Sequence, residues 1–70
     1  IVGVLIMRYL TEFERLKVGA TFSKNGNGWL KRSTRTAEII RPDDQPYTGK
    51  WFYFRTGEKI EITNLADLVK

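Results

Sequence analysis

A short basic segment of the chain combines the side chain types that bind nucleic acids. Lys31, Arg32 and Arg35 lie close together, just after Trp29. Cationic side chains contact phosphates, and exposed aromatic rings stack on bases, as in proteins that hold single strands. We expect a neighbouring strand to add two more aromatic rings. The predicted nucleic-acid-binding residues are therefore Trp29, Lys31, Arg32, Arg35, Trp51 and Tyr53.

The basic charge is concentrated in the middle of the chain. The whole sequence has 12 Lys and Arg against 8 Asp and Glu, a formal net charge of +4. Residues 24–41 contain one acidic residue, Glu38, and five basic residues, Lys24, Lys31, Arg32, Arg35 and Arg41. This distribution favours an anionic partner, which is either DNA or RNA or an acidic protein.

Two other interpretations of the same residues remain open. In the first, the cations form a solvated strand face, and Trp29, Trp51 and Tyr53 fill or line the core, because so short a chain needs most of its aromatic rings for burial. In the second, the aromatic residues form a groove that holds an extended peptide, and the basic face steers an acidic protein partner toward it. The second interpretation makes the chain a protein interaction module.

Enzymatic chemistry finds little support in the sequence. The chain contains no Cys and no His, which excludes thiolate zinc sites, Cys nucleophiles and Ser-His-Asp triads. The paired carboxylates Asp43-Asp44 and Glu58 with Glu61 are expected in a turn and on the outer side of an edge strand. Gly26-Asn27-Gly28 lacks the helix and the Lys-Ser/Thr step of a phosphate loop. We therefore expect a binding protein with no catalytic residue, metal or cofactor.

Short elements must position these residues. Thr11 and Glu14 have capping-box spacing, which predicts one helical turn that ends before Gly19. A strand over 20–23 leads to the hairpin turn Asn25-Gly26. In the next strand, over 29–33, we expect Leu30 to point inward and Trp29 to be partly exposed.

The second half of the chain continues the strand pattern. A β-branched segment over 34–41 has Ala37 and Ile39 on its buried face, and a loop rich in turn formers covers 42–49. Strands over 50–55 and 58–63 follow, and Asn64 caps a last turn in which Leu65, Leu68 and Val69 cover one end of the core. The predicted core consists of Phe13, Leu16, Val18, Phe22, Leu30, Phe52, Phe54, Ile60 and Ile62.

Four to five short strands with tight turns predict an all-β protein, a small SH3-like antiparallel barrel with short helical turns near its ends. The segments Phe13-x-x-Leu16-Lys17-Val18-Gly19-x-x-Phe22 and Trp51-Phe52-x-Phe54, followed by Glu58-x-Ile60-Glu61, support this fold. The chain resembles small, uncharacterised SH3-like barrel proteins of bacteriophages and prophages over about residues 8–63. The resemblance implies a barrel and a phage origin, and it transfers no functional residue.

The N-terminal run over 1–6 is apolar and uncharged, and it is too short to span a bilayer as a helix. Three interpretations stay open: upstream sequence before a natural start at Met7, a strand that pairs with another chain, or a buried strand. The first two leave a single domain over 7–70. We expect a monomer or a weak homodimer that does not contact a membrane. We also expect the protein in the cytoplasm, and in that of a bacterial host if a phage encodes it.

Overall fold

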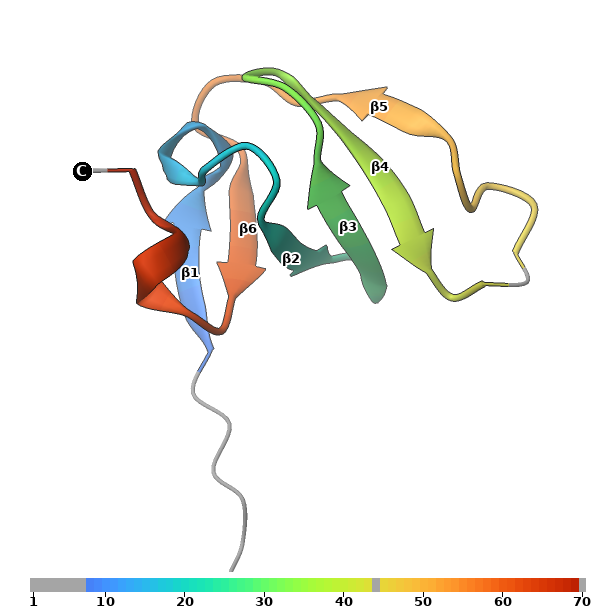
Figure 1. The fold of residues 1–70 in the computed structure, drawn as a ribbon, viewed down its shortest axis with the longest axis horizontal. Coiled ribbons are helices and arrows are strands. Elements are labelled where there is room, and N and C mark those ends of the chain that lie inside the picture. Colours follow the sequence, from blue (N-terminus) through green and yellow to red (C-terminus); the bar gives the residue numbers. More distant parts are fainter. Residues whose placement is uncertain (1–7, 44, 70) are drawn as a thin grey trace, which may run out of the picture.

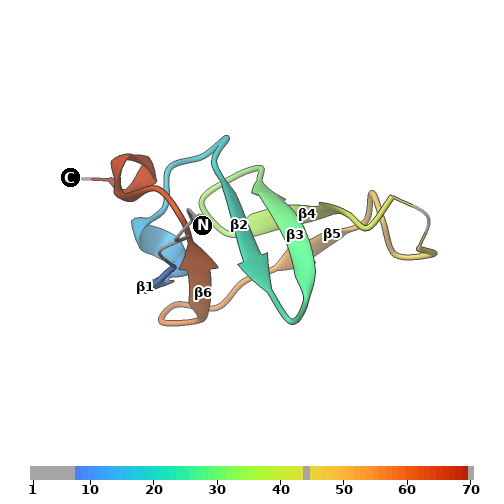
Figure 2. The ribbon, with the colours of Figure 1, turned by 90° about the horizontal axis from the view of Figure 1, so that it is seen from below.

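A single antiparallel sheet contains all the strands of the computed structural model, which describes residues 8–43 and 45–69. Its six strands follow the order β1-β6-β2-β3-β4-β5, as Figure 1 shows from one side and Figure 2 from below. The strands are β1 (Tyr9–Glu12), β2 (Thr21–Lys24), β3 (Asn27–Lys31), β4 (Thr36–Arg41), β5 (Trp51–Tyr53) and β6 (Lys59–Ile62). The 3-10 turns are η1 (Phe13–Arg15) and η2 (Leu65–Asp67). The all-β prediction is confirmed.

The sheet is built mainly from hairpins between consecutive strands. Asn25 and Gly26 have φ values of 53° and 77°, and these left-handed conformations give the tight β2-β3 turn that their sequence predicts. β3 pairs with β4, and β4 pairs with β5. The exception is β6, which returns to lie between β1 and β2.

The number of strands exceeds the predicted four to five because the chain is extended before η1. Thr11 lies in β1 opposite Ile60, and η1 has no side-chain cap. The predicted helical turn is therefore present as η1, but its predicted capping box is wrong. The carboxylate of Glu14 instead accepts hydrogen bonds from the backbone N–H of Gly57 at 3.0 and 3.2 Å, which ties η1 to the turn before β6.

The described strands do not close into a barrel. β1 and β5 are the end strands of the sheet order and do not pair with each other (Figure 1). The sheet nevertheless bends enough to bring residues beyond its two ends together. The ring of Phe13, which follows β1, stacks on the ring of Phe54, which follows β5, with centroids 4.4 Å apart.

Aromatic rings fill the concave side of this bent sheet. Phe54 makes edge-to-face contacts with Phe22 at 5.5 Å and with Trp29 at 5.1 Å. Such contacts add to the hydrophobic stabilisation that burial of the rings supplies. The buried core is Phe13, Leu16, Phe22, Trp29, Ala37, Ile39, Phe54, Ile60 and Ile62, which confirms most of the predicted core and the buried face predicted for Ala37 and Ile39.

Three predicted core residues lie elsewhere. Val18 and Phe52 are exposed, and Leu30 is only half-buried. Strand β3 has the opposite orientation to the one predicted, since its inward residues are Trp29 and Lys31. An indole ring buries more apolar area than a leucine side chain, which favours this orientation in a small core.

The C-terminal turn confirms only part of its prediction. Asn64 caps η2, because its Oδ1 accepts a hydrogen bond from the backbone N–H of Ala66 at 3.0 Å. Leu68 forms an isolated bridge with Leu16 and packs against the core. Leu65 and Val69 are exposed, so Leu68 alone of the three predicted residues covers the core.

The predictions for 1–6 and for a start at Met7 lie outside the described residues. None of the helices in the described part of the chain has the length and apolar character needed to cross a membrane.

Candidate nucleic-acid interface

The six predicted binding residues lie on different sides of the sheet. Trp29 and Lys31 point to the concave side, into the core. Trp51 and Tyr53 are exposed on β5, Arg32 directly follows β3, and Arg35 lies in the β3-β4 turn. The structure thus divides the predicted site into a buried pair and an exposed group of four.

Lys31 is a structural residue. Its side chain is only 3% exposed. Its Nζ donates hydrogen bonds to the carbonyl oxygens of Phe13 at 2.8 Å and of Leu16 at 2.6 Å, and it lies 4.3 Å from the centre of the Phe13 ring. Burial lowers the pKa of this ammonium group below its usual value. The predicted exposure of Lys31 is wrong, because the carbonyl groups around η1 and the ring of Phe13 hold its ammonium group inside the protein.

Trp29 is also part of the core. It is 6% exposed, and its ring stacks on Phe22 with centroids 5.9 Å apart. Its Nε1 donates a hydrogen bond to the carbonyl oxygen of Lys24 at 3.1 Å, so the polar atom of the indole has a partner. The predicted partial exposure of Trp29 is therefore wrong, and its ring is not free to stack on a base.

The exposed residues are brought together by the register of β3, β4 and β5. Glu38 in β4 lies opposite Leu30 on one side and Trp51 on the other. The Arg32 Nε donates a hydrogen bond to the Glu38 Oε1 at 2.7 Å. The Arg32 guanidinium group lies 5.5 Å from the centre of the Trp51 ring, within cation-π range.

Tyr53 continues this convex face. It lies opposite Thr36, whose carbonyl accepts a hydrogen bond from the backbone N–H of Arg32 at 2.9 Å. Trp51 and Tyr53 are two residues apart in a strand, so their side chains point to the same face. Their exposed fractions of 58% and 68% leave both rings accessible.

Arg35 supplies a cation at the end of this face. The Ser33 hydroxyl oxygen accepts hydrogen bonds from the backbone N–H groups of Arg35 and Thr36, which orders the turn. The Arg35 Nη1 donates to the Thr56 hydroxyl oxygen at 2.5 Å. Among the residues that the structure describes, no carboxylate forms an ion pair with Arg35. We name Arg32, Arg35, Trp51 and Tyr53 the convex patch.

A cleft of about 410 Å³ lies on the concave side. Phe52 is part of its wall and contacts Trp29 edge to face at 5.5 Å. Tyr47, which the sequence analysis did not single out, also lines the cleft. The alternation of β5 is the signal for this second surface, since it places Phe52 on the side opposite Trp51 and Tyr53.

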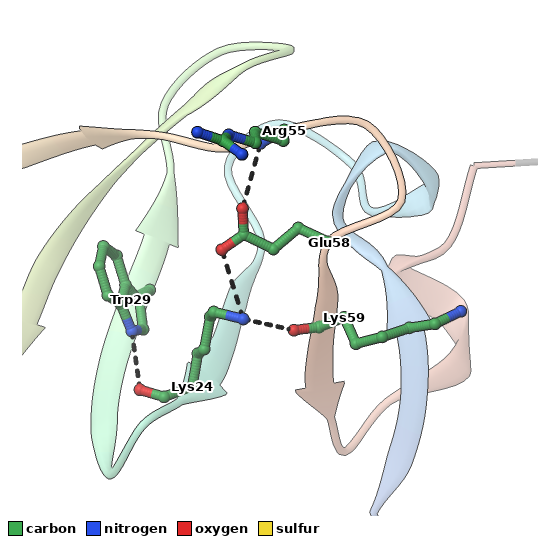
Figure 3. A network of polar contacts seen from close by, with 5 residues as sticks. All are labelled: Lys24, Trp29, Arg55, Glu58 and Lys59. Atoms are coloured by element: carbon green, nitrogen blue, oxygen red, sulfur yellow. Dashed lines mark hydrogen bonds and ion pairs between the residues drawn. The ribbon is translucent and has the colours of Figure 1, made fainter.

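At one end of the cleft the polar side chains already have hydrogen-bond or ion-pair partners (Figure 3). The Lys24 Nζ lies 3.3 Å from a carboxylate oxygen of Glu58 and donates to the carbonyl oxygen of Lys59 at 2.9 Å. The other carboxylate oxygen of Glu58 accepts a hydrogen bond from the backbone N–H of Arg55 at 3.1 Å. This network joins β2 to the turn before β6, where the sheet has few ladder contacts.

The candidate carboxylates do not assemble into a metal site. Glu58 is engaged as described, and Glu61 forms an ion pair with Arg8 at 3.7 Å. β6 is an inner strand of the sheet, so the predicted edge position of Glu61 is wrong. Over 8–43 and 45–69 no group of three or more His, Cys, Asp or Glu residues is placed to hold a metal ion.

No protein-family model, no curated protein and no solved structure matches the chain.

Proposed function

We propose that the chain binds single-stranded nucleic acid through the convex patch. The observation that carries this proposal is the pair of exposed rings, Trp51 and Tyr53, on one face of an edge strand with two arginines beside them. Adjacent residues of the same face are about 6–7 Å apart along a strand, so the two rings offer neighbouring stacking surfaces for successive, splayed-out bases. Ring stacking tolerates any base, so this surface favours binding without strong sequence preference.

The two arginines of the convex patch differ in how available they are to a phosphate. Among the described residues, the Arg35 guanidinium group has only the Thr56 hydroxyl as a partner, so it is available for a phosphate. Arg32 is held by Glu38 and by the Trp51 ring, so it orients the indole more than it attracts an anion. We therefore expect few phosphate contacts. The affinity for nucleic acid should still fall with added salt, because each contact releases counterions.

Titration of labelled single-stranded and double-stranded oligonucleotides at several salt concentrations tests the proposal. Trp51→Ala and Tyr53→Ala should each weaken single-strand binding by about 1–3 kcal/mol with little change in salt slope. Arg35→Ala should reduce the slope by about 1. Leu10→Ala is the matched control, because Leu10 is also an exposed apolar residue, on the other edge strand. Absence of saturable binding at low salt would reject nucleic acid as the ligand.

The concave cleft supports a second candidate, capture of an extended peptide from an acidic protein. Its aromatic wall at Phe52 and Tyr47 suits apolar or proline side chains, and the positive net charge of the chain favours an acidic partner. Nuclear magnetic resonance with an acidic, proline-containing peptide distinguishes the candidates. Cleft binding shifts signals of Phe52 and Tyr47, whereas binding at the convex patch shifts those of Trp51 and Arg32, which do not line the cleft.

The proposal extends to the fold relationship, the origin and the location of the protein. We infer an SH3-like relationship from the hairpin succession, the bent sheet and the motif over 13–22, and a phage origin from the sequence resemblance alone. A nucleic-acid-binding protein of that origin would act in the cytoplasm of a bacterial host. The proposed activity is binding, without a catalytic step or cofactor.

A further inference from the structure

The exposed edge of β5 carries a pairing surface that does not depend on the identity of the ligand. The backbone N–H of Phe54 donates to the carbonyl oxygen of Arg35 at 2.7 Å, and that of Ile39 donates to the carbonyl oxygen of Lys50 at 3.1 Å. In an antiparallel pair, alternate residues direct their N–H and C=O groups toward the same neighbour. Lys50, Phe52 and Phe54 therefore face β4 through their backbone groups.

Trp51 and Tyr53 consequently direct their backbone N–H and C=O groups away from β4. β5 is an end strand of the sheet, and in the part of the chain that the structure describes no backbone hydrogen bond outside the β4-β5 ladder uses these groups. Exposed edges of this kind readily accept another strand. Trp51, Phe52 and Tyr53 are all exposed, so within 8–43 and 45–69 no side-chain packing buries this strand.

We propose that β5 pairs with β5 of a second copy of this chain, antiparallel and across a two-fold axis at Phe52. In this register Trp51 lies opposite Tyr53 of the second copy, and the two residues exchange both of their outward hydrogen bonds. Tyr53 and Trp51 of the second copy form the symmetry-related pair with the same two hydrogen bonds. Every outward-facing backbone N–H and C=O group of β5 then has a partner. Phe52 lies opposite Phe52 of the second copy as the closely spaced, non-hydrogen-bonded pair.

The side chains suit this register. Aromatic residues directly opposite one another stabilise an antiparallel pair, and each position of β5 supplies one. Trp51–Tyr53 contains no charged side chain, so this register places no like charges opposite each other. It would join the convex patches of both copies on one continuous face and bury Phe52 of both on the concave face.

The expected dimer is weak, because a three-residue strand buries less than the roughly 1,200 Å² typical of stable complexes. Salt separates this proposal from nucleic-acid binding. Each copy has a formal net charge of +4, so added salt screens repulsion between copies and should strengthen the dimer. Nucleic-acid binding should respond in the opposite direction.

Sedimentation of the full chain without nucleic acid, at concentrations up to about 1 mM, tests the pairing. Self-association should appear with rising concentration, and Tyr53→Lys should weaken it about tenfold or more by replacing an aromatic pair with an edge lysine. Leu10→Lys adds the same charge on the opposite edge strand and should leave the dimer unchanged. A chain that stays monomeric at about 1 mM, or that loses association equally in both variants, overturns the proposal.

Disulfide trapping provides an independent readout of the register. The sequence has no cysteine, so Phe52→Cys introduces a single thiol. Facing residues of a non-hydrogen-bonded pair have Cα atoms about 4.5 Å apart, which lies within the range of disulfides. Mild oxidation with diamide should cross-link Phe52→Cys much faster than Leu10→Cys. Equal rates would show that β5 is not at the two-fold axis.

Discussion

The concave and convex faces of β3, β4 and β5 use the same residue types in opposite ways. Lys31 and Arg32 are consecutive in the sequence, and both are cations. Lys31 is buried and donates to two backbone carbonyl groups, whereas Arg32 is exposed and meets a carboxylate and an indole ring. A cation in a basic run can therefore be a structural element, and the strand face that it occupies decides which role it has.

The aromatic residues show the same division. Trp29 and Phe54 pack into a cluster of rings on the concave face, while Trp51 and Tyr53 leave most of their surface accessible on the convex face. Aromatic content alone therefore does not measure the size of a binding surface. Substitutions on the two faces should separate stability from binding.

The largest effect is expected from Phe54→Ala. Phe54 is 2% exposed and contacts Phe13, Phe22 and Trp29, so its removal leaves a cavity where these rings meet. We expect a loss of about 3–5 kcal/mol in the free energy of unfolding, measured by chemical denaturation. Tyr53→Ala on the convex face should cost less than about 1 kcal/mol. Equal losses would show that the two faces do not differ as described.

A smaller effect is expected from Lys31→Ala, which leaves the carbonyl group of Leu16 without its donor and the carbonyl group of Phe13 with only the backbone N–H of Leu16. We expect a loss of about 2–4 kcal/mol in unfolding free energy. Arg32→Ala removes the neighbouring cation and should cost only about 0.5–1 kcal/mol, because its ion pair with Glu38 is partly exposed. If Arg32→Ala were the more damaging of the two, the assignment of Lys31 as the structural cation would be wrong.

The smallest effect concerns Glu14, an exposed charge with a structural role. The hydrogen bond from the Gly57 N–H lowers the pKa of this carboxyl group below its usual 4.5. The folded protein therefore binds fewer protons than the unfolded chain just below pH 4.5, so stability decreases as the pH falls through this range. Glu14→Gln should reduce that decrease in thermal melts between neutral and acidic pH. An unchanged acid dependence would exclude a contribution from Glu14.

Local turn chemistry and strand pattern were sufficient to predict much of this fold. Asn25-Gly26 gives the β2-β3 hairpin because both residues tolerate positive φ, and the alternation over 59–62 places Ile60 and Ile62 in the core. The predicted helical turn is present at Phe13–Arg15, but Thr11 does not cap it, because pairing with Ile60 in β6 stabilises an extended backbone there. That partner lies far along the chain, so local spacing does not reveal it.

The candidate site was predicted only in part for a related reason. The period of two in a strand determines which residues share a face, and the sequence by itself therefore placed Trp29 with Lys31 and Trp51 with Tyr53. Which face turns inward is a tertiary property wherever both faces carry large apolar side chains. In β3 the bending of the sheet settled it, because Trp29 completes the cluster of rings and the carbonyl groups around η1 accept the Lys31 ammonium group.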